Sequence, residues 1–179
     1  MSQHILKIYF YRLTGDSILN KYNITVVVNL TTVGENLQDQ PNNAFFWKGN
    51  ETLTGSSTFV AYPNAVDLFG SNFTNVARDI QSRLSSYAAK VSSASGGVTK
   101  SCDLLNFFQN QYNLLFKSLV PASEFIYSLY SNTFDVEVWG LLPFSRGSVH
   151  IGTAASNGQA VINPNYFMVD WDMTAQSMF

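Results

Sequence analysis

The residue types best suited to binding a small polar molecule lie together in EVWGLLPFSRGSVHI, residues 137 to 151. In an extended strand, side chains two residues apart share a face, so Glu137, Trp139 and Leu141 are expected on one side and Val138 on the other. A carboxylate accepts hydrogen bonds from hydroxyl groups, and an indole offers a flat apolar wall, so this pair suits a ligand with several hydroxyls. The alternative interpretation is a solvated Glu137 at a sheet edge and a Trp139 in the core, and the pattern leaves both open.

The same stretch is expected to form a β-hairpin. Its two strand-like runs are separated by a polar turn, Ser145-Arg146-Gly147, in which a glycine tolerates a positive φ. In the second run, residues 148 to 151, polar and apolar side chains alternate as in a strand with one buried face. The remaining elements of the chain are placed relative to this hairpin.

Other residues with reactive side chains form weaker patterns. Cys102 is the only cysteine, which excludes an intramolecular disulfide and argues against a cysteine-based metal site. His4 and His150 are far apart in the sequence and do not form a recognisable metal-binding pair. Asp170 and Asp172 share a face only in an extended chain, so helix capping explains them better than paired acid–base chemistry does.

Several functional classes lack their sequence signatures. The chain has no Gly-x-Gly-x-x-Gly after a strand, no P-loop, no Gly-x-Ser-x-Gly turn and no His-Glu-x-x-His helix. Ten lysines and arginines stand against 12 aspartates and glutamates, a formal charge of −2, and no basic run argues for nucleic acid. No apolar run approaches the roughly 20 residues of a membrane helix. Neither nucleic acid nor a membrane is therefore expected as a partner.

The 179 residues suffice for one domain with its own core, and two helices are expected to supply much of it. The first follows a cap at Thr74 or Asn75, and the second runs from Thr99 or Ser101 to a stop at Pro121. Their apolar stripes at helical spacing are Val76, Ile80, Leu84, Tyr87 and Val91 in the first, and Leu104, Phe108, Tyr112, Leu115 and Leu119 in the second.

Strands are predicted at residues 24 to 30, 43 to 47 and 123 to 130, besides those of the hairpin. The first of them, ITVVVNL, is rich in β-branched residues. Asp16 can cap a short helical turn, and another helix is expected to start at Met173, where the sequence soon ends as though cut. Because strands and helices occur in separate blocks, the fold class is α+β, an antiparallel sheet with helices packed on one side.

Four Asn-x-Thr acceptor sites for N-linked glycans occur, at Asn23, Asn29, Asn50 and Asn72. Such sites suggest passage through a secretory pathway. The chain is rich in asparagine, serine and threonine, however, so about three sites are expected by chance from composition, and their number alone carries little information. The opening MSQHILKIYFYRL is short and interrupted by Lys7, which argues against a signal peptide.

Five segments in this order resemble the glucose-methanol-choline (GMC) family of flavoprotein oxidoreductases, and within it the fungal glucose oxidases and FAD-dependent glucose dehydrogenases. They are ILNKYNITVVVNLTTVGENLQDQ (18–40), VAYPNAVDLFG (60–70), IQSRLSSYAA (80–89), FDVEVWGLLPFSRGSVHI (134–151) and INPNYFMVDWD (162–172). VGENLQDQ is typical of the family, and WGLLPFSRGSVHI with INPNYF is typical of its glucose-active branch. Most of the chain is covered, and residues 1–15 remain unmatched apart from Leu13-Thr14-Gly15, which is similar to a family loop.

The resemblance implies a place in a larger protein. Family members combine an FAD-binding domain with a substrate domain, a large antiparallel sheet backed by helices. Residues 16–40 would end the FAD-domain region and form the joint, and residues 41–179 would be part of the substrate domain. The family's phosphate-binding glycines lie before the matched region and its catalytic histidine after it, while His150 matches a strand histidine of the family. No catalytic residue and no FAD-binding residue is therefore assigned to this chain.

The resemblance also implies roles for individual residues. Glu137 would hydrogen-bond sugar hydroxyls and Trp139 would wall the pocket, while Ile126 or Tyr127 would line it, with Tyr127 taken as the third substrate-binding residue. The expected function is that of a fragment of an FAD-dependent oxidoreductase acting on the CH–OH group of a sugar. Alone it is expected to be inactive, poorly soluble and without tight FAD binding, its partner being the FAD-binding part of the enzyme. The alternative is a stand-alone, non-catalytic sugar-binding or structural module. Similar family members are secreted.

Overall fold

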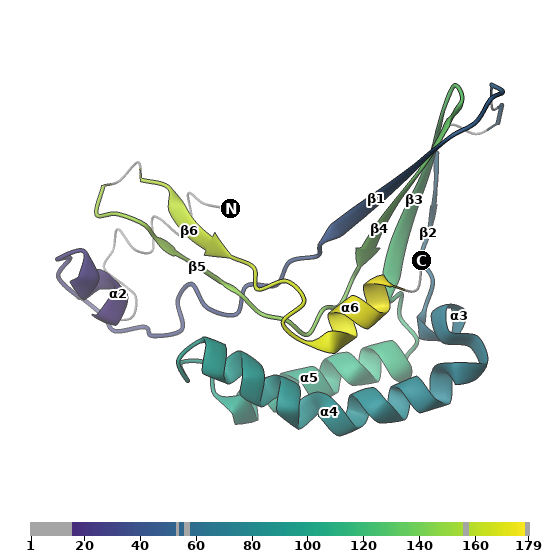
Figure 1. The fold of residues 1–179 in the computed structure, drawn as a ribbon. Helices are drawn as coiled ribbons and strands as arrows, with labels where there is room; N and C mark the ends of the chain where they lie inside the picture. The colour runs from purple at the N-terminus through teal and green to yellow at the C-terminus, as the bar shows by residue number, and fades with distance from the viewer. Residues whose placement is uncertain (1–15, 53, 56–57, 156–157, 178–179) are drawn as a thin grey trace.

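A computed structural model of the chain describes residues 16–52, 54–55, 58–155 and 158–177. It has a mixed α+β fold, as predicted, and its strands form two antiparallel sheets (Figure 1). The predictions for residues 1–15 lie outside the described residues. In chain order the elements are α2 (Asp16–Lys21), β1 (Asn42–Lys48), β2 (Thr58–Ala61), α3 (Ala65–Phe69), η1 (Gly70–Asn72), α4 (Phe73–Ala94), α5 (Ser101–Phe116), β3 (Ser123–Tyr130), β4 (Thr133–Gly140), β5 (Ser148–Ile151), β6 (Ala160–Asn163) and α6 (Asp170–Gln176).

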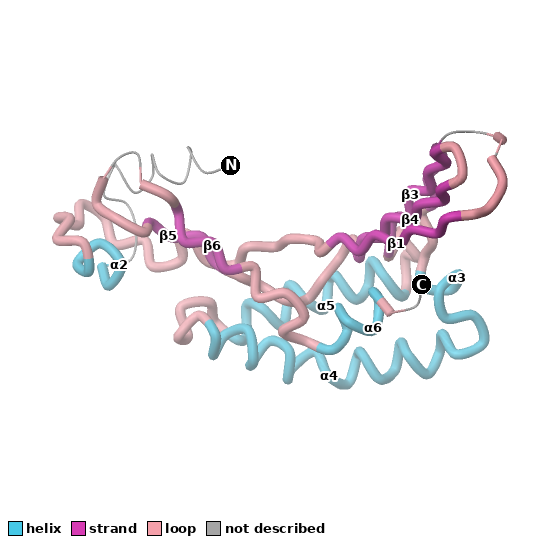
Figure 2. The backbone as a smooth tube through the Cα atoms, turned by 45° about the horizontal axis from the view of Figure 1, so that its top comes forward, coloured by secondary structure: helices cyan, strands magenta, loops and turns pink. Residues whose placement is uncertain are grey.

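The larger sheet has the strand order β1-β4-β3-β2, so β4 is a central strand with a neighbour on each side (Figure 2). All its pairs are antiparallel. Strands β3 and β4 form a hairpin through Ser131 and Asn132, and Ser131 has a positive φ of 57°. The predicted strands at 43 to 47 and 123 to 130 are confirmed as β1 and β3.

The main buried core lies between α4 and α5 and the segments that cross them. Both apolar stripes predicted from the helical spacing are confirmed, because most of their residues are buried. Phe144 from the segment after β4 and Trp171 from α6 insert onto this layer, where each makes an edge-to-face contact with an aromatic residue of α5. The helices and this crossing segment therefore form one cluster.

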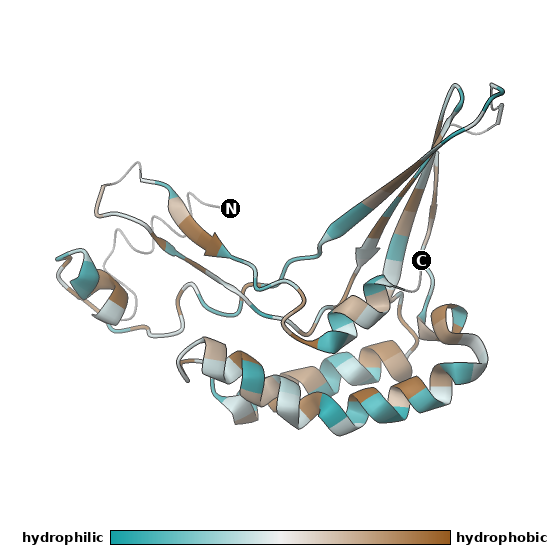
Figure 3. Cartoon of the chain, in the orientation of Figure 1, coloured by the Kyte–Doolittle hydropathy of each residue, from teal (hydrophilic) through white to brown (hydrophobic). Residues whose placement is uncertain are grey.

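The four-stranded sheet rises from one end of the helical layer (Figures 1 and 2). Among the described residues, the main buried cluster contains no residue of β1 to β4. Both faces of the sheet therefore keep apolar side chains in contact with solvent, and Phe46 and Trp47 on β1 are 67% and 53% exposed. Figure 3 shows hydrophobic stretches along the strands of this sheet.

The prediction of one hairpin spanning residues 137 to 151 is wrong. Strand β4 belongs to the large sheet, whereas β5 pairs with β6 in a separate two-stranded ribbon. The turn prediction for Gly147 is also wrong, because its φ is not among the positive values. Instead, a Cβ atom at Gly147 would lie 2.0 Å from the Asn163 carbonyl oxygen, so a close approach of two backbones requires the glycine.

Residues 24 to 30 do not form one of the described strands, contrary to prediction. Val27 is 62% exposed there, and within the run only Val28 takes part in a β-bridge. Leu119 lies beyond the end of α5 and is exposed, so it does not belong to the predicted stripe.

The predicted helix caps also differ in the structure. Helix α4 begins one residue before Thr74, with Asn72 at its N-cap position, and α6 begins at Asp170 rather than Met173. Neither N-cap side chain bonds its helix. Asp172 therefore lies inside the first turn of α6, which leaves its carboxylate available for another partner.

Candidate functional site

The two residues singled out as possible ligand contacts lie on one face of the central strand β4. Glu137 is paired with Ala44 on β1 and Ile126 on β3. Trp139 is paired with Asn42 on β1, and its side chain, like that of Glu137, is half-buried. The two-residue period of the strand thus gives the shared face that the sequence predicts. Neither side chain belongs to the main buried core.

Glu137 keeps hydrogen-bonding capacity on this face. Its Oε2 accepts a hydrogen bond of 2.9 Å from Nδ2 of Asn42, which fixes the direction of the carboxylate. No other hydrogen bond to this carboxylate is found within the described part of the chain. An ionised carboxylate has about four acceptor positions, so one fixed bond leaves room for ligand hydroxyls.

Tyr127 lies on the opposite face of the sheet from Glu137. Its neighbour Ile126 is the residue directly across from Glu137, and one step along a strand reverses the face. The Tyr127 ring stacks on Phe59 at 4.6 Å between centroids and on Phe134 at 6.1 Å. The structure therefore brings Glu137, Trp139 and Ile126 together and separates Tyr127 from them.

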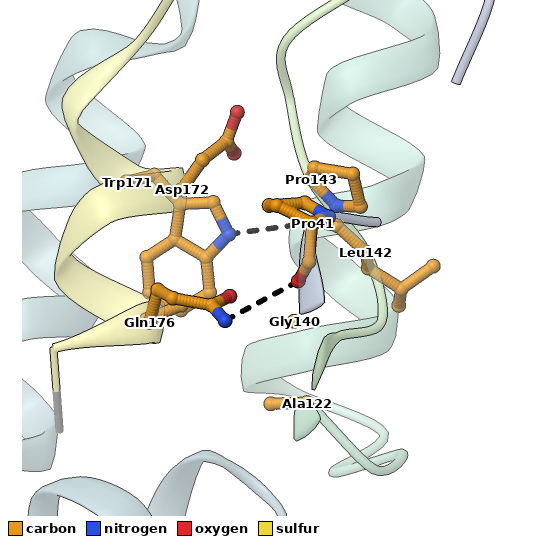
Figure 4. A pocket seen from close by; sticks show the side chains of 9 residues that line it. Pro41, Ala122, Gly140, Leu142, Pro143, Trp171, Asp172 and Gln176 are labelled. Carbon is orange, nitrogen blue, oxygen red and sulfur yellow. Dashed lines mark hydrogen bonds between the residues drawn. The ribbon is translucent and has the colours of Figure 1, made fainter. Parts of the chain in front are cut away.

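Helix α6 fixes the base of β4 beside this face. The Gln176 side chain, 6% exposed, donates from Nε2 to the carbonyl oxygens of Val138 at 3.0 Å and Pro41 at 3.3 Å. Val138 is the residue between Glu137 and Trp139, and Pro41 immediately precedes β1. Gln176 thus ties together the two strands that carry the acid and its amide partner. Figure 4 shows this junction, whose cavity of about 10 Å³ has room for one water at most.

Replacing Gln176 by methionine is expected to lower the free energy of unfolding by about 1–3 kcal/mol, because a buried and a partly buried carbonyl oxygen lose the amide donor while the side-chain volume stays similar. Urea unfolding followed by tryptophan fluorescence measures the change. Gln109→Met on α5 is the matched control, since the Gln109 amide bonds only Asn113 at 3.4 Å within the described residues. Equal losses in the two variants would show that Gln176 does not anchor β4.

The segment after β4 is held by a buried acid from α6. Asp172 is 6% exposed, and its carboxylate accepts the backbone N–H groups of Phe144 at 2.7 Å and Ser145 at 2.9 Å. Burial raises the pKa of Asp172, and the hydrogen bonds from Ser145 and Phe144 act in the opposite direction. The carboxylate is therefore a structural acceptor for a turn of the chain, which agrees with neither helix capping nor an acid–base pair with Asp170.

A buried arginine occupies the same turn. The Arg146 guanidinium donates to the carbonyl oxygen of Ser145 at 2.8 Å and to Oε1 of Gln111 at 2.9 Å, and it lies over the rings of Phe107 and Phe108. Burial lowers the pKa of Arg146 to about 10, with the charge of Asp172 acting against that shift. The side chain therefore connects the segment after β4 to α5.

Three segments that carry the family-like sequence patterns, around residues 35–37, 146–150 and 163–165, meet next to Arg146. Leu37 and Gly147 exchange backbone hydrogen bonds of 2.8 Å, and Nε2 of His150 lies 2.9 Å from Oε1 of Glu35. A polar cavity of about 40 Å³ lies at the junction. It is lined by polar residues of four segments: Glu35 and Asn36, Ser95 and Thr99, Arg146 and Ser148, and Asn163 and Asn165. His150 thus joins β5 to the loop of residues 31–41.

Sequence reasoning missed Asn42 and Gln176. The partner of Glu137 comes from β1, and Gln176 comes from the last helix, both far away in sequence. No local pattern marks an asparagine or glutamine that acts across such a distance.

Other kinds of site are absent from the described part of the chain. It contains no group of three or more His, Cys, Asp or Glu side chains placed to hold a metal ion. Cys102 is exposed there, and its Sγ contacts only the Asp103 carboxylate, at 3.7 Å. None of the helices described is long and apolar enough to cross a membrane.

Comparison with known proteins finds relatives of one kind. A glucose oxidase-like protein, fsoC, from Humicola fuscoatra is 32% identical over 147 residues, covering 82% of this chain and 25% of the relative. A glucose oxidase from Penicillium chrysogenum is 25% identical over 162 residues, covering 90% of this chain and 26% of the relative. A GMC oxidoreductase family protein, Mala s 12, from Malassezia sympodialis is 29% identical over 176 residues, 89% of this chain and 28% of the relative. No family model matches the chain.

Solved structures share the fold. An FAD-dependent oxidoreductase from Chaetomium thermophilum superimposes with a TM-score of 0.68 at 17% identity, over 92% of this chain and 33% of that protein. A fungal aryl-alcohol oxidase superimposes with a TM-score of 0.69 at 16% identity, over 93% of this chain and 33% of that protein. The chain spans about a quarter to a third of the length of these proteins.

Proposed function

Since this chain belongs to the GMC oxidoreductase family, we propose that it supplies the substrate-binding wall of a longer FAD-dependent enzyme that oxidises a CH–OH group of a sugar. In this proposal residues 16–40 end the flavin-domain region and form the joint, and residues 41–179 form part of the substrate domain. Glu137 accepts hydrogen bonds from the sugar hydroxyls and Trp139 packs against the apolar face of the ring.

The observation that carries the proposal is the shared face of Glu137 and Trp139 on a central, paired strand. An acid held by Asn42 and an indole two residues away form a rigid polar-apolar pair outside the core. Gln176 fixes the backbone between them. Rigid placement of this kind favours binding, because few rotamers have to be ordered when a ligand arrives. Ile126 across the strand pair completes the wall, and Tyr127 acts from the other face as support for the sheet.

Family members are FAD-dependent, and in this proposal the flavin is held mainly by residues outside this chain. The proposal is supported by the sequence, which has no Gly-x-Gly-x-x-Gly to approach a pyrophosphate. In the complete protein, flavin would accept the hydride, and that step involves groups outside this chain. What these residues do is orient the sugar and exclude water on one side of it.

The test uses a polypeptide of the relatives' length that contains this chain. We expect it to bind FAD, and glucose without NAD to bleach the flavin absorption. Glu137→Gln is expected to raise the KM for the sugar about 10- to 100-fold, the effect of losing one charge-assisted hydrogen bond of about 1.5–3 kcal/mol. Asp103→Asn on α5 is the matched control and should leave KM unchanged.

Two results would contradict the proposal. A full-length polypeptide that takes up no FAD has no family chemistry. A KM for the sugar that stays the same in Glu137→Gln removes the wall from the substrate site, even if the flavin is reduced. For the 179-residue chain by itself we expect no turnover and no tight FAD binding. Calorimetry that detects glucose binding to this chain, lost in Glu137→Gln, would instead favour a stand-alone sugar-binding module.

A further inference from the structure

The end of the large sheet farthest from the helices carries an acceptor sequence for an N-linked glycan, Asn50-Glu51-Thr52. It follows β1 directly. All four acceptor asparagines of the chain and their threonines are exposed, so exposure alone does not distinguish among them. Three further observations distinguish Asn50 from the other sites: the anchored backbone before it, the absence of a side-chain hydrogen bond within the described residues, and the exposed aromatic residues nearby.

The backbone before Asn50 is anchored to the β3–β4 turn. The N–H of Gly49 donates to the Asn132 carbonyl oxygen at 2.7 Å, and Nδ2 of Asn132 donates back to the Gly49 carbonyl oxygen at 3.2 Å. These two bonds hold the backbone next to Asn50 at the end of β1, where Asn50 itself is exposed. An asparagine at such a turn can carry a bulky group without disturbing the ladder.

The Asn50 side chain makes no hydrogen bond within the described residues. The other acceptor sites are engaged in local structure. Oδ1 of Asn72 accepts from Nδ2 of Asn75 at 3.1 Å, and the sequence after it enters α4. Asn23 has a left-handed φ of 56° just after α2. Asn29 takes part in an interaction with another residue.

Exposed aromatic residues surround this end of the sheet. Phe46 and Trp47 precede Asn50 on β1, and Tyr130 at the end of β3 is 61% exposed. Large exposed aromatic groups promote association, and a hydrated glycan beside them opposes it. A glycan at Asn50 would therefore cover apolar surface that no part of the described fold buries.

We propose that Asn50 is an N-glycosylation site whose glycan shields the aromatic end of the sheet, so that this end faces solvent. In the transfer, Nδ2 of Asn50 bonds to the anomeric carbon of an oligosaccharide carried on a polyprenyl pyrophosphate. The bond between that carbon and the pyrophosphate oxygen breaks, the polyprenyl pyrophosphate leaves, and the amide proton passes to a base of the host transferase. This inference does not rest on the proposed function.

The test directs the 179-residue chain into the secretory pathway of a yeast with a cleavable leader. Protein from both the medium and the membrane fraction is treated with peptide N-glycosidase in heavy-oxygen water, so that a deglycosylated asparagine becomes a labelled aspartate. The peptide masses are then measured by mass spectrometry. We expect the Asn50 peptide to carry the label, and the label to be lost in Asn50→Gln and Thr52→Ala but kept in Thr52→Ser. Thr54→Ala, in the same loop outside the acceptor sequence, is the control. An unlabelled Asn50 peptide, or a label that remains in Thr52→Ala, would contradict the proposal that Asn50 is glycosylated.

A second measurement tests the shielding. Trp47 is far more exposed than Trp171, which is buried, and Trp139 is half-buried. Trimming the glycan from the folded protein should increase acrylamide quenching of tryptophan fluorescence, and Trp47→Phe should remove that increase. Quenching that does not change on trimming would show that the glycan does not cover this end of the sheet.

Discussion

Replacing Asp172 by asparagine is expected to lower the free energy of unfolding by about 3 kcal/mol. The carboxylate accepts two backbone N–H groups in a site shielded from water. An asparagine of the same shape offers one oxygen and one NH₂ group, so one buried N–H would face another donor. The nearby Arg146 would also lose the negative charge that offsets part of its burial.

The neighbouring acid of α6 provides the control. Asp170 lies two residues away in the same helix, is half-exposed and pairs with Arg83. Asp170→Asn is expected to change stability by at most about 1 kcal/mol, as is usual for an exposed ion pair. Urea unfolding of the wild type and both variants, followed by tryptophan fluorescence, measures the difference. Losses of similar size in both variants would show that the hydrogen bonds of Asp172 do not determine the stability of this turn.

Asp172 also shows where sequence reasoning stops. An aspartate before an apolar run indicates a helix start, and a helix is present at that place. The sequence does not reveal that the carboxylate bonds to a backbone 27 residues earlier, since that depends on how α6 packs on the segment after β4. Periodicity reports which face of an element is apolar, and it contains no information about which distant backbone needs an acceptor.

Strand prediction has the same limit. Alternation and β-branched residues identified β1, β3 and the first part of the 137–151 stretch, because these properties are local. Pairing is not local, and the predicted hairpin failed because β4 prefers β3 and β1 to β5. The run at 24 to 30 has the composition of a strand but no partner strand among the described residues.

The candidate site was predictable to the extent that it depends on one strand. The period of two placed Glu137 and Trp139 on one face, and the structure agrees. The third position depended on an alignment that was ambiguous by one residue, and in a strand one residue decides the face. Ile126 therefore lies beside Glu137, and Tyr127 lies behind the sheet.

The backbone around Gly147 is hydrogen-bonded to two other chain segments. On one side, Leu37 exchanges two backbone hydrogen bonds with Gly147. On the other, Ser148 begins β5 by pairing with Asn163, the last residue of β6. Three chain segments therefore meet at one backbone position, and the space left there for a side chain is set by main-chain atoms that hydrogen bonds hold in place.

Gly147→Ala is accordingly expected to destabilise the fold by at least about 3 kcal/mol, because an added methyl group has no flexible neighbour to displace. Its Cβ would lie 2.0 Å from the Asn163 carbonyl oxygen and 2.6 Å from the Pro164 carbonyl carbon, so the backbone of one segment has to move. The contact between β5 and the loop of residues 31–41 should loosen, which hydrogen exchange can detect at the Val149 amide, bonded to the Gly34 carbonyl oxygen at 2.7 Å.

Gly49→Ala separates this effect from the general cost of replacing a glycine. A Cβ atom at Gly49 would meet no atom closer than 3.7 Å, and Gly49 is not among the glycines with a positive φ. This variant should stay within about 1 kcal/mol of the wild type in urea unfolding. If Gly147→Ala were as stable as Gly49→Ala, with unchanged exchange at Val149, the contact with Asn163 would not constrain the fold, and the junction of the three segments would have to be looser than the structure shows.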